Sequence, residues 1–95
     1  MLRIEVLDRV PKRHPDVTKG DAVYAWKNAI ACAPAIEQNP NRYYAIGPDS
    51  KGRLIELVGV IKSDGSVLII HGQTPPQQSI KKRLNLLRRK GNKHG

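Results

Sequence analysis

Histidine, arginine, lysine and tyrosine gather at three places in the chain, and side chains of these types can cleave RNA without a metal ion. The three places are Lys12-Arg13-His14, Arg42-Tyr43-Tyr44, and His71 with Gln73. Such cleavage needs one group to take the proton of the 2′-hydroxyl, one to protonate the leaving oxygen, and cations to stabilise charge on the phosphate. His71 and His14 are therefore the candidate acid and base.

Both histidines also have a structural explanation. His71 shares its predicted strand face with Val67 and Ile69, so a hydrogen-bonded structural histidine is the alternative to a catalytic one. His14 precedes a proline, a place where a polar residue often closes a turn. The residue types alone do not decide between a catalytic and a structural role for either histidine.

The chain lacks the patterns of a metal site, a nucleotide cofactor or a pair of catalytic carboxylates. Its three histidines and single cysteine show none of the spacings typical of zinc proteins. No glycine-rich loop follows a predicted strand and opens a helix. Glu56 stands alone within a predicted strand. We therefore expect no metal and no small-molecule cofactor.

Positive charge is concentrated toward the end of the sequence. The chain has 17 Lys and Arg residues against 8 Asp and Glu, a formal net charge of +9. Residues 81–95 contain seven of these bases and no acid, whereas residues 1–80 hold ten bases and eight acids. This pattern implies a polyanion or an acidic protein as partner, although a basic tail can also serve solubility alone.

Size and composition indicate one small intracellular domain. With 95 residues, 39% of them hydrophobic, the chain has enough apolar material for a single core. Cys32 is the single cysteine and forms no internal disulfide, which favours a reducing compartment. No stretch has the pattern of a signal peptide or a membrane helix. We expect a cytoplasmic protein with one domain over residues 1–90 and a basic, disordered tail over residues 91–95.

The first half of the chain contains a clear helix signal. Thr18 and Asp21 have the spacing of a capping box and open a helix. The apolar residues at helical spacing behind them are Val23, Trp26 and Ile30. Pro34, which has no amide hydrogen, is predicted to end this helix, and Ala35–Arg42 is predicted to be a loop. Leu2–Arg13 fits either a strand or a short helix.

The middle of the chain predicts three antiparallel strands. They are Tyr43–Ile46, Arg53–Ile61 and Ser66–Gly72, separated by turn residues. Asp64 before Gly65 indicates a two-residue type I′ hairpin turn. The second strand is almost wholly apolar, which places it in the middle of the sheet. Tyr43 and Tyr44 alternate in direction, so one should pack while the other meets solvent or a ligand.

A basic helix follows the strands. Ile80, Leu84 and Leu87 form an apolar stripe, basic residues lie on the other faces, and Gly91 ends the pattern. The predicted order is one or two helices, three strands and a helix. This order predicts a small α+β domain with an antiparallel sheet of at least three strands and helices mostly on one side of it.

Short motifs follow one another in an order that points to one family. They are the run Lys12–Thr18 before an alanine-rich helix, the run Arg42–Gly47, the strands Gly52–Val60 and Val67–Ile70, and the basic helix Ile80–Arg89. In order and spacing they resemble the BrnT-like toxins, ribonuclease partners in a class of bacterial type II toxin-antitoxin modules. The resemblance covers most of the chain. It implies a RelE-like toxin fold, metal-independent RNA cleavage that inhibits translation, and neutralisation by a small antitoxin protein.

Under this hypothesis the predicted site combines acid-base residues with phosphate ligands. His71 and His14 are the catalytic candidates. The predicted RNA-phosphate ligands are Lys12, Arg13, Arg42, Lys81, Lys82 and Arg83, with Tyr43 and Gln73 as further substrate contacts. The family commonly has Ser-x-Arg-x-Ala after the third strand, and here Gln73 replaces that arginine. The alternative is a non-catalytic module that uses its basic end to bind nucleic acid or to dock an acidic antitoxin.

Overall fold

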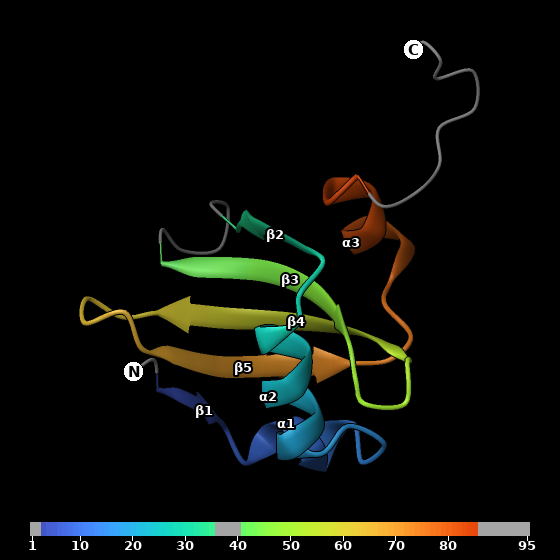
Figure 1. Ribbon diagram of the computed structural model, residues 1–95, viewed down its shortest axis with the longest axis horizontal. Helices are drawn as coiled ribbons and strands as arrows, with labels where there is room; N and C mark the ends of the chain where they lie inside the picture. The colour runs from blue at the N-terminus through green and yellow to red at the C-terminus, as the bar shows by residue number, and fades with distance from the viewer. Residues whose placement is uncertain (1–2, 36–40, 86–95) are drawn as a thin grey trace, which may run out of the picture.

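A five-stranded mixed sheet with three helices forms the described part of the chain. The computed structural model describes residues 3–35 and 41–85. The strands are β1 (Ile4–Val6), β2 (Ala31–Pro34), β3 (Arg42–Pro48), β4 (Leu54–Ile61) and β5 (Val67–Gln73), and the helices are α1 (Arg9–Arg13), α2 (Lys19–Lys27) and α3 (Gln78–Arg83). The strand order is β1-β5-β4-β3-β2 (Figure 1). The α+β class predicted from the sequence is confirmed.

The predicted three-strand meander is confirmed as β3, β4 and β5. Both strand pairs are antiparallel and β4 is central, as its apolar composition predicts. The turn before β5 differs from the prediction, because a three-residue loop, Ser63–Gly65, is closed by hydrogen bonding between Lys62 and Ser66. Within this loop only Gly65 has a positive φ, +87°. A type I′ turn needs two such residues, so this hairpin uses the three-residue loop with glycine in the left-handed position.

The ambiguous segment at the start of the chain forms both a strand and a helix. β1 pairs parallel with β5, with Ile4 opposite Val67 and Val6 opposite Ile69. The prediction of an antiparallel sheet is therefore wrong for this edge. The register of the three-residue strand β1 is determined by its pairing with β5, a segment about 60 residues away in the chain, and no local sequence pattern reveals that pairing. α1 follows directly. It carries Pro11 in its first turn, where the missing amide hydrogen costs no helical hydrogen bond.

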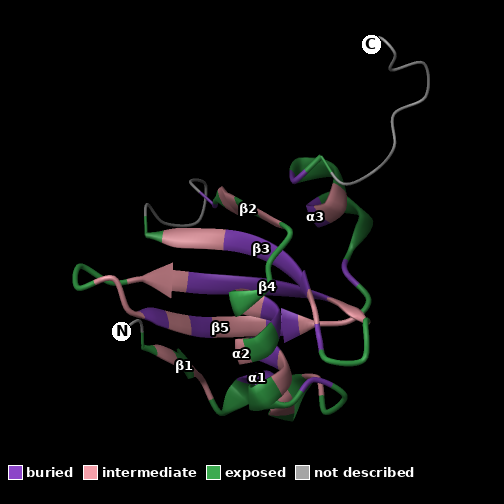
Figure 2. Ribbon diagram, viewed as in Figure 1, coloured by how far each residue is buried: buried purple, intermediate pink, exposed green. Residues whose placement is uncertain are grey.

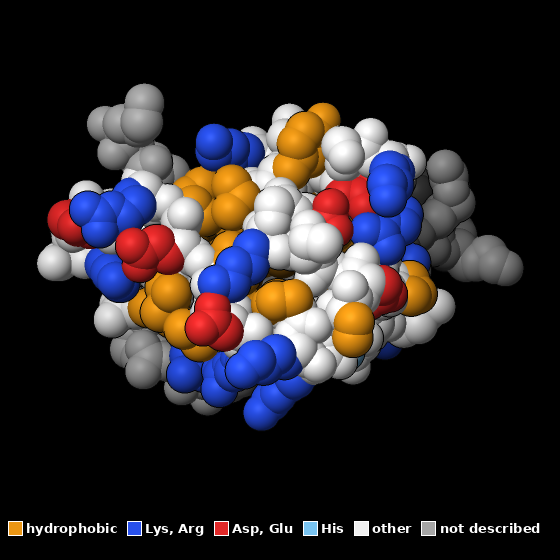
Figure 3. All heavy atoms as spheres, turned by 90° about the horizontal axis from the view of Figure 1, so that it is seen from below, with side chains coloured by type: hydrophobic (Ala, Val, Ile, Leu, Met, Phe, Trp, Pro, Cys, Tyr) orange, Lys and Arg blue, Asp and Glu red, His pale blue; other side chains and the backbone are white. Residues whose placement is uncertain are grey.

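The outer side of β1 and α1 carries charges of both signs. Lys19 of α2 pairs with Asp8, and Arg3 lies 3.5 Å from Glu5. Figure 3 views the molecule from below and shows basic and acidic side chains interspersed with apolar patches. This side therefore has no strong charge of one sign.

The second helix begins as predicted but ends early. Thr18 and Asp21 form the reciprocal hydrogen bonds of a capping box. α2 then stops at Lys27 rather than at Pro34, because Ala31–Pro34 pairs with β3 as the strand β2. Proline is compatible with this position because β2 is an edge strand. Residues 36–40 of the predicted loop lie outside the described residues.

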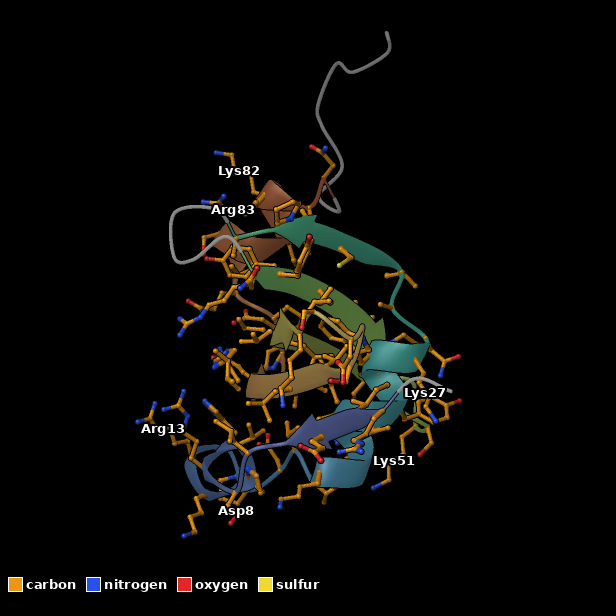
Figure 4. All side chains as sticks on the ribbon, turned by 90° about the vertical axis from the view of Figure 1, so that its left-hand side faces the viewer. Asp8, Arg13, Lys27, Lys51, Lys82 and Arg83 are labelled. Carbon is orange, nitrogen blue, oxygen red and sulfur yellow. The ribbon has the colours of Figure 1, made fainter. Side chains whose placement is uncertain are left out.

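Two apolar clusters cover opposite faces of the sheet. The cluster with α2 comprises Val17, Ala22, Ala25, Ala45, Ile55, Leu57, Val67 and Ile69. The cluster with α3 comprises Ala35, Tyr44, Ile46, Val58, Ile80 and Leu84. Because neighbours along a strand alternate between faces, α2 and α3 lie on opposite sides, as Figures 1 and 4 also show. The prediction of helices mostly on one side is wrong for α3. Figure 2 shows buried residues along the middle of the sheet.

The last described helix is shorter than its predicted length. Ile80 and Leu84 are buried against the sheet, as the apolar stripe predicts. The helix ends at Arg83, and Asn85 has φ 59°, a left-handed conformation that asparagine tolerates at helix ends. Leu87 and residues 91–95 lie outside the described residues. Among the helices that the structure describes, none is long and apolar enough to cross a membrane.

Candidate active site

A β-bulge in β5 decides where His71 points. The register places His71 opposite Val58 and Ile69 opposite the next residue of β4, so Ile70 is an extra residue between them. One extra residue reverses the alternation of side chains, which turns His71 toward α3 while Ile69 stays in the α2 cluster. The prediction that His71 shares a face with Val67 and Ile69 is wrong for this reason.

Glu56 is the centre of hydrogen bonding on the α3 face. It is only 2% exposed, yet three donors reach its carboxylate. His71 Nε2 lies 2.7 Å from Oε2. The backbone amide of Gln77 donates to Oε1 at 2.8 Å, and its side-chain amide donates to Oε2 at 3.1 Å. Glu56 of β4 thus joins the end of β5 to the start of α3.

These contacts set the charge of Glu56 and the tautomer of His71. Burial is the largest influence and pushes the pKa of Glu56 upward, but the hydrogen bonds from His71 and Gln77 together outweigh it and hold the pKa below its ordinary value of 4.5. The carboxylate is therefore ionised at neutral pH. Because it then only accepts hydrogen bonds, Nε2 of His71 carries the hydrogen. In the neutral ring this leaves Nδ1 to accept a proton.

A groove of about 400 Å³ opens on the α3 face beside this pair. Arg9 and Arg13 from α1 and Arg42 from β3 line one part of it. Tyr44, Val58, Ile70 and Ile80 form an apolar wall. With three guanidinium groups against the single carboxylate of Glu56, the lining favours an anion such as a phosphate.

α1 brings the predicted N-terminal residues to the end of β5. Because β1 runs parallel beside β5, the helix after β1 continues along the same edge of the sheet. Arg9 Nε donates to the carbonyl oxygen of Ile70 at 3.4 Å. His14, directly after the helix, meets the His71 ring edge to face with the ring centroids 5.8 Å apart. The parallel edge strand therefore makes the two candidate histidines neighbours.

Tyr44 lies beneath α3 and close to a cation. The tyrosine is 8% exposed, and the guanidinium carbon of Arg83 is 5.3 Å from its ring centroid, within the range of a cation–π contact. Figure 4 shows Arg13 and Arg83 extending to one side of the molecule, whereas Lys27 and Lys51 lie on the other side.

The structure brings four of the predicted site residues together. His71, Arg13 and Arg42 line the groove, and His14 contacts the ring of His71. The groove lining does not include His14 itself, nor Lys12, Tyr43, Gln73, Lys81, Lys82 or Arg83. Of the two adjacent tyrosines, Tyr44 is therefore the one that meets the groove.

Glu56, Arg9 and Gln77 are site residues that the sequence prediction missed. Glu56 had a signal, because a carboxylate inside an apolar central strand is seldom buried without hydrogen-bonding partners. Arg9 and Gln77 had none, since their place in the site depends on how α1 and α3 pack against distant strands.

The arrangement supplies acid-base and phosphate-binding groups rather than a set of metal ligands. Within residues 3–35 and 41–85, no group of three or more His, Cys, Asp or Glu side chains could hold a metal ion. Comparison with protein-family models, with curated proteins and with solved structures finds no match to this chain.

Proposed function

We propose that this chain is an endoribonuclease that cuts RNA with its own side chains, and that it is the toxin of a bacterial toxin-antitoxin module. The observation that carries the proposal is the His71–Glu56 pair inside a groove lined by Arg9, Arg13 and Arg42. The resemblance of its motifs to BrnT-like toxins supports the same function. The β3–β4–β5 meander followed by α3 supports a RelE-like fold.

In the proposed reaction His71 is the general base. Glu56 holds the hydrogen on Nε2, so Nδ1 takes the proton of a ribose 2′-hydroxyl. The 2′-oxygen then bonds to the adjacent phosphorus, and the bond from phosphorus to the 5′-oxygen breaks, leaving a 2′,3′-cyclic phosphate. The ionised Glu56 stabilises the imidazolium that forms on His71.

The other groups complete the charge balance of this reaction. His14, in ring contact with His71, is the candidate acid that protonates the departing 5′-oxygen. Arg9, Arg13 and Arg42 stabilise the charge that develops on the phosphate oxygens. They supply the positive charge that Gln73, in place of the family's arginine, does not.

The proposed partners are an RNA substrate and an acidic antitoxin, and the proposed location is the cytoplasm. Lys82 and Arg83 are exposed on α3, beyond the groove lining, where an acidic protein can pair with them. A partner bound to α3 would also cover the groove, because Ser79 and Ile80 of this helix line it.

The test is induced expression in bacteria, followed by analysis of growth and of total RNA from the same cultures. We expect wild type to arrest growth with cleaved RNA, and His71→Ala and His71→Gln to lose both effects. The glutamine variant keeps a donor for Glu56, so folding is retained and verified by circular dichroism. Lys27→Gln, on the opposite side of the molecule, is the matched control that keeps activity.

Purified protein gives the sharper version of this experiment. RNA should yield products that end in a 2′,3′-cyclic phosphate, whereas 2′-O-methyl RNA should stay intact because it lacks the nucleophile. Loss of the base should lower the cleavage rate by about 10²- to 10⁴-fold. Full activity of folded His71→Gln protein would contradict the assigned role.

A second candidate function is RNA binding without cleavage. The observation that favours it is the complete pairing of Glu56, because a histidine held this way also serves as a structural residue. This function predicts growth arrest with intact RNA, and an RNA affinity that falls steeply with salt.

A further inference from the structure

One outer edge of the sheet has backbone groups that face away from every other strand. In the edge strand β1, the carbonyl oxygen of Arg3 accepts from the Val67 amide at 2.9 Å, and the Leu7 amide donates to β5 at 3.0 Å. Because a parallel ladder uses every second residue of a strand, the N–H and C=O groups of Ile4 and Val6 point away from β5. Within the part of the chain that the structure describes, these groups have no hydrogen-bond partner. β1 is thus a template on which a further strand can pair.

The opposite edge of the sheet carries a residue that blocks such pairing. β2 ends at Pro34, and the next residue, Ala35, donates its amide to the carbonyl oxygen of Arg42 at 2.8 Å. Because bonded and non-bonded residues alternate in an antiparallel pair, an amide at position 34 would point away from β3, and proline has no hydrogen to donate there. Proline protects many edge strands in this way. β1, with the sequence Ile-Glu-Val, has no such protection.

The surface around β1 is complementary to itself in charge. Two ion pairs flank the strand, Arg3 with Glu5 and Lys19 with Asp8, and Figure 3 views this edge of the molecule. The groove on the α3 face is different, because its three guanidinium groups against one carboxylate would make two copies repel each other there. A contact between two identical surfaces needs charges of both signs on the same surface. The β1 edge meets this requirement and the groove does not.

An apolar hollow lies beside the exposed backbone of β1. Its volume is about 520 Å³, and its apolar lining comes from Ile4, Val6, Leu7, Val23 and Leu68. Ile4 and Val6 pack against the α2 cluster but are only partly buried. A strand added beside β1 would cover them further, so apolar burial would add to the backbone hydrogen bonds.

We propose that two copies of this chain associate edge to edge through β1, as antiparallel strands related by a two-fold axis at Ile4. The Ile4 amide of each copy then donates to the Ile4 carbonyl oxygen of the other. Arg3 of one copy lies opposite Glu5 of the second copy, and the same pair recurs across the axis. A register centred on Glu5 would instead place two glutamates face to face, which is destabilising. This inference is independent of the proposed function.

The first test exchanges the charges across the axis. Sedimentation velocity of wild-type protein from about 1 µM to 1 mM should show a monomer–dimer equilibrium. Arg3→Glu and Glu5→Arg each turn two attractive pairs into repulsive ones, so each variant alone should dimerise about 10-fold more weakly. An equimolar mixture of the two variants restores opposite charges in both pairs and should form a mixed dimer as tight as the wild-type dimer.

Controls and contrary outcomes follow from the same design. Both side chains are exposed, 76% for Arg3 and 52% for Glu5, so the variants should keep the fold, verified by circular dichroism. Lys51→Glu makes the same change of charge as Arg3→Glu at an exposed position before β4, and it should dimerise normally. A wild-type monomer at every concentration overturns the proposal and leaves the edge to a strand of a different protein. A dimer that ignores both charge reversals, or a mixture that does not recover, overturns this interface.

The second test acts on the backbone. In Ile4→Pro the hydrogen that is lost points away from β5, so β1 keeps its pairing within the chain while the hydrogen bonds across the axis are removed. Ile4→Ala is the matched control, because it shortens the same side chain and keeps the amide. We expect Ile4→Pro to be monomeric where Ile4→Ala still dimerises. A folded Ile4→Pro protein that dimerises as well as Ile4→Ala overturns the strand pairing, and the charge exchange decides the matter should the proline variant not fold.

Discussion

The two faces of the sheet are built in different ways. The α2 face is filled by small and branched apolar side chains, and every residue of its buried cluster is at most 3% exposed. The α3 face has a six-residue helix, a buried carboxylate and an open groove. Burying a charged group removes it from water, and this desolvation cost cancels much of the free energy gained from its hydrogen bonds. We therefore expect the α2 face to contribute most of the folding stability and the α3 face to bind the ligand.

Close packing on the α2 face extends to the backbone. A Cβ at Gly47 would lie 2.1 Å from the carbonyl oxygen of Ala25, and a Cβ at Gly59 would lie 2.7 Å from the Trp26 ring. Arg53 adds a polar link, since it pairs with Asp49 at 2.6 Å and with Asp21 of α2 at 3.4 Å. Around these two glycines the α2 face has no space for a ligand.

The largest expected effect on stability comes from adding a methyl group at Gly47, where β3 approaches α2. In Gly47→Ala the new methyl group collides with the backbone of α2, which cannot move without leaving the sheet. We expect a loss of about 3 kcal/mol in the free energy of unfolding, measured by urea denaturation. A loss below about 1 kcal/mol would contradict the tight approach of α2 and β3.

Changes at the rim of the groove should act on RNA affinity instead. Arg13→Gln and Arg42→Gln each remove a cation from the lining, so each should weaken binding of 2′-O-methyl RNA by about 10-fold and lower the salt slope by roughly 0.7 for a single strand. Lys27→Gln removes the same charge from the α2 side and serves as control. Equal losses in all three variants would show that net charge, not the groove, determines affinity.

Local signals in the sequence were sufficient for part of the fold. The capping box at Thr18, the meander and the central position of β4 all follow from neighbouring residues. Ala31–Pro34 reads as the end of a helix, and only pairing with β3 makes it a strand. The parallel pairing of β1 depends in the same way on a distant segment.

The candidate site shows the same division. Residue type was enough to select His71, Arg13 and Arg42, but their meeting in one groove depends on tertiary structure. The extra residue Ile70 leaves no mark in the apolar pattern of β5, and without it His71 would lie on the α2 face. Glu56 was visible as a charge in an apolar strand, although its partners were not.

Acid should reveal the contribution of Glu56 to stability. Its pKa in the folded protein is lower than the ordinary 4.5, so below pH 4.5 the unfolded chain binds the proton more readily and stability falls with pH. The contribution is complete above pH 4.5 and is lost as the pH falls through the folded value. We therefore expect the stability difference between wild type and Glu56→Gln to be largest at neutral pH and to shrink below pH 4.5. A difference independent of pH would contradict the lowered pKa.

The smallest expected effect comes from adding a methyl group at a glycine inside α2. It tests whether the loss of stability expected for Gly47→Ala is due to tight packing or to a general intolerance of α2 to substitution. Gly20 lies inside α2, and a Cβ there would meet nothing closer than the Thr18 hydroxyl at 3.8 Å. Gly20→Ala should therefore raise the free energy of unfolding by about 0.5 kcal/mol, because alanine favours the helix and restricts the unfolded chain. The substitution is chemically the same as Gly47→Ala and should have the opposite sign. Destabilisation by both would mean that α2 resists any added methyl group, and the contrast between the two faces would then rest on the groove alone.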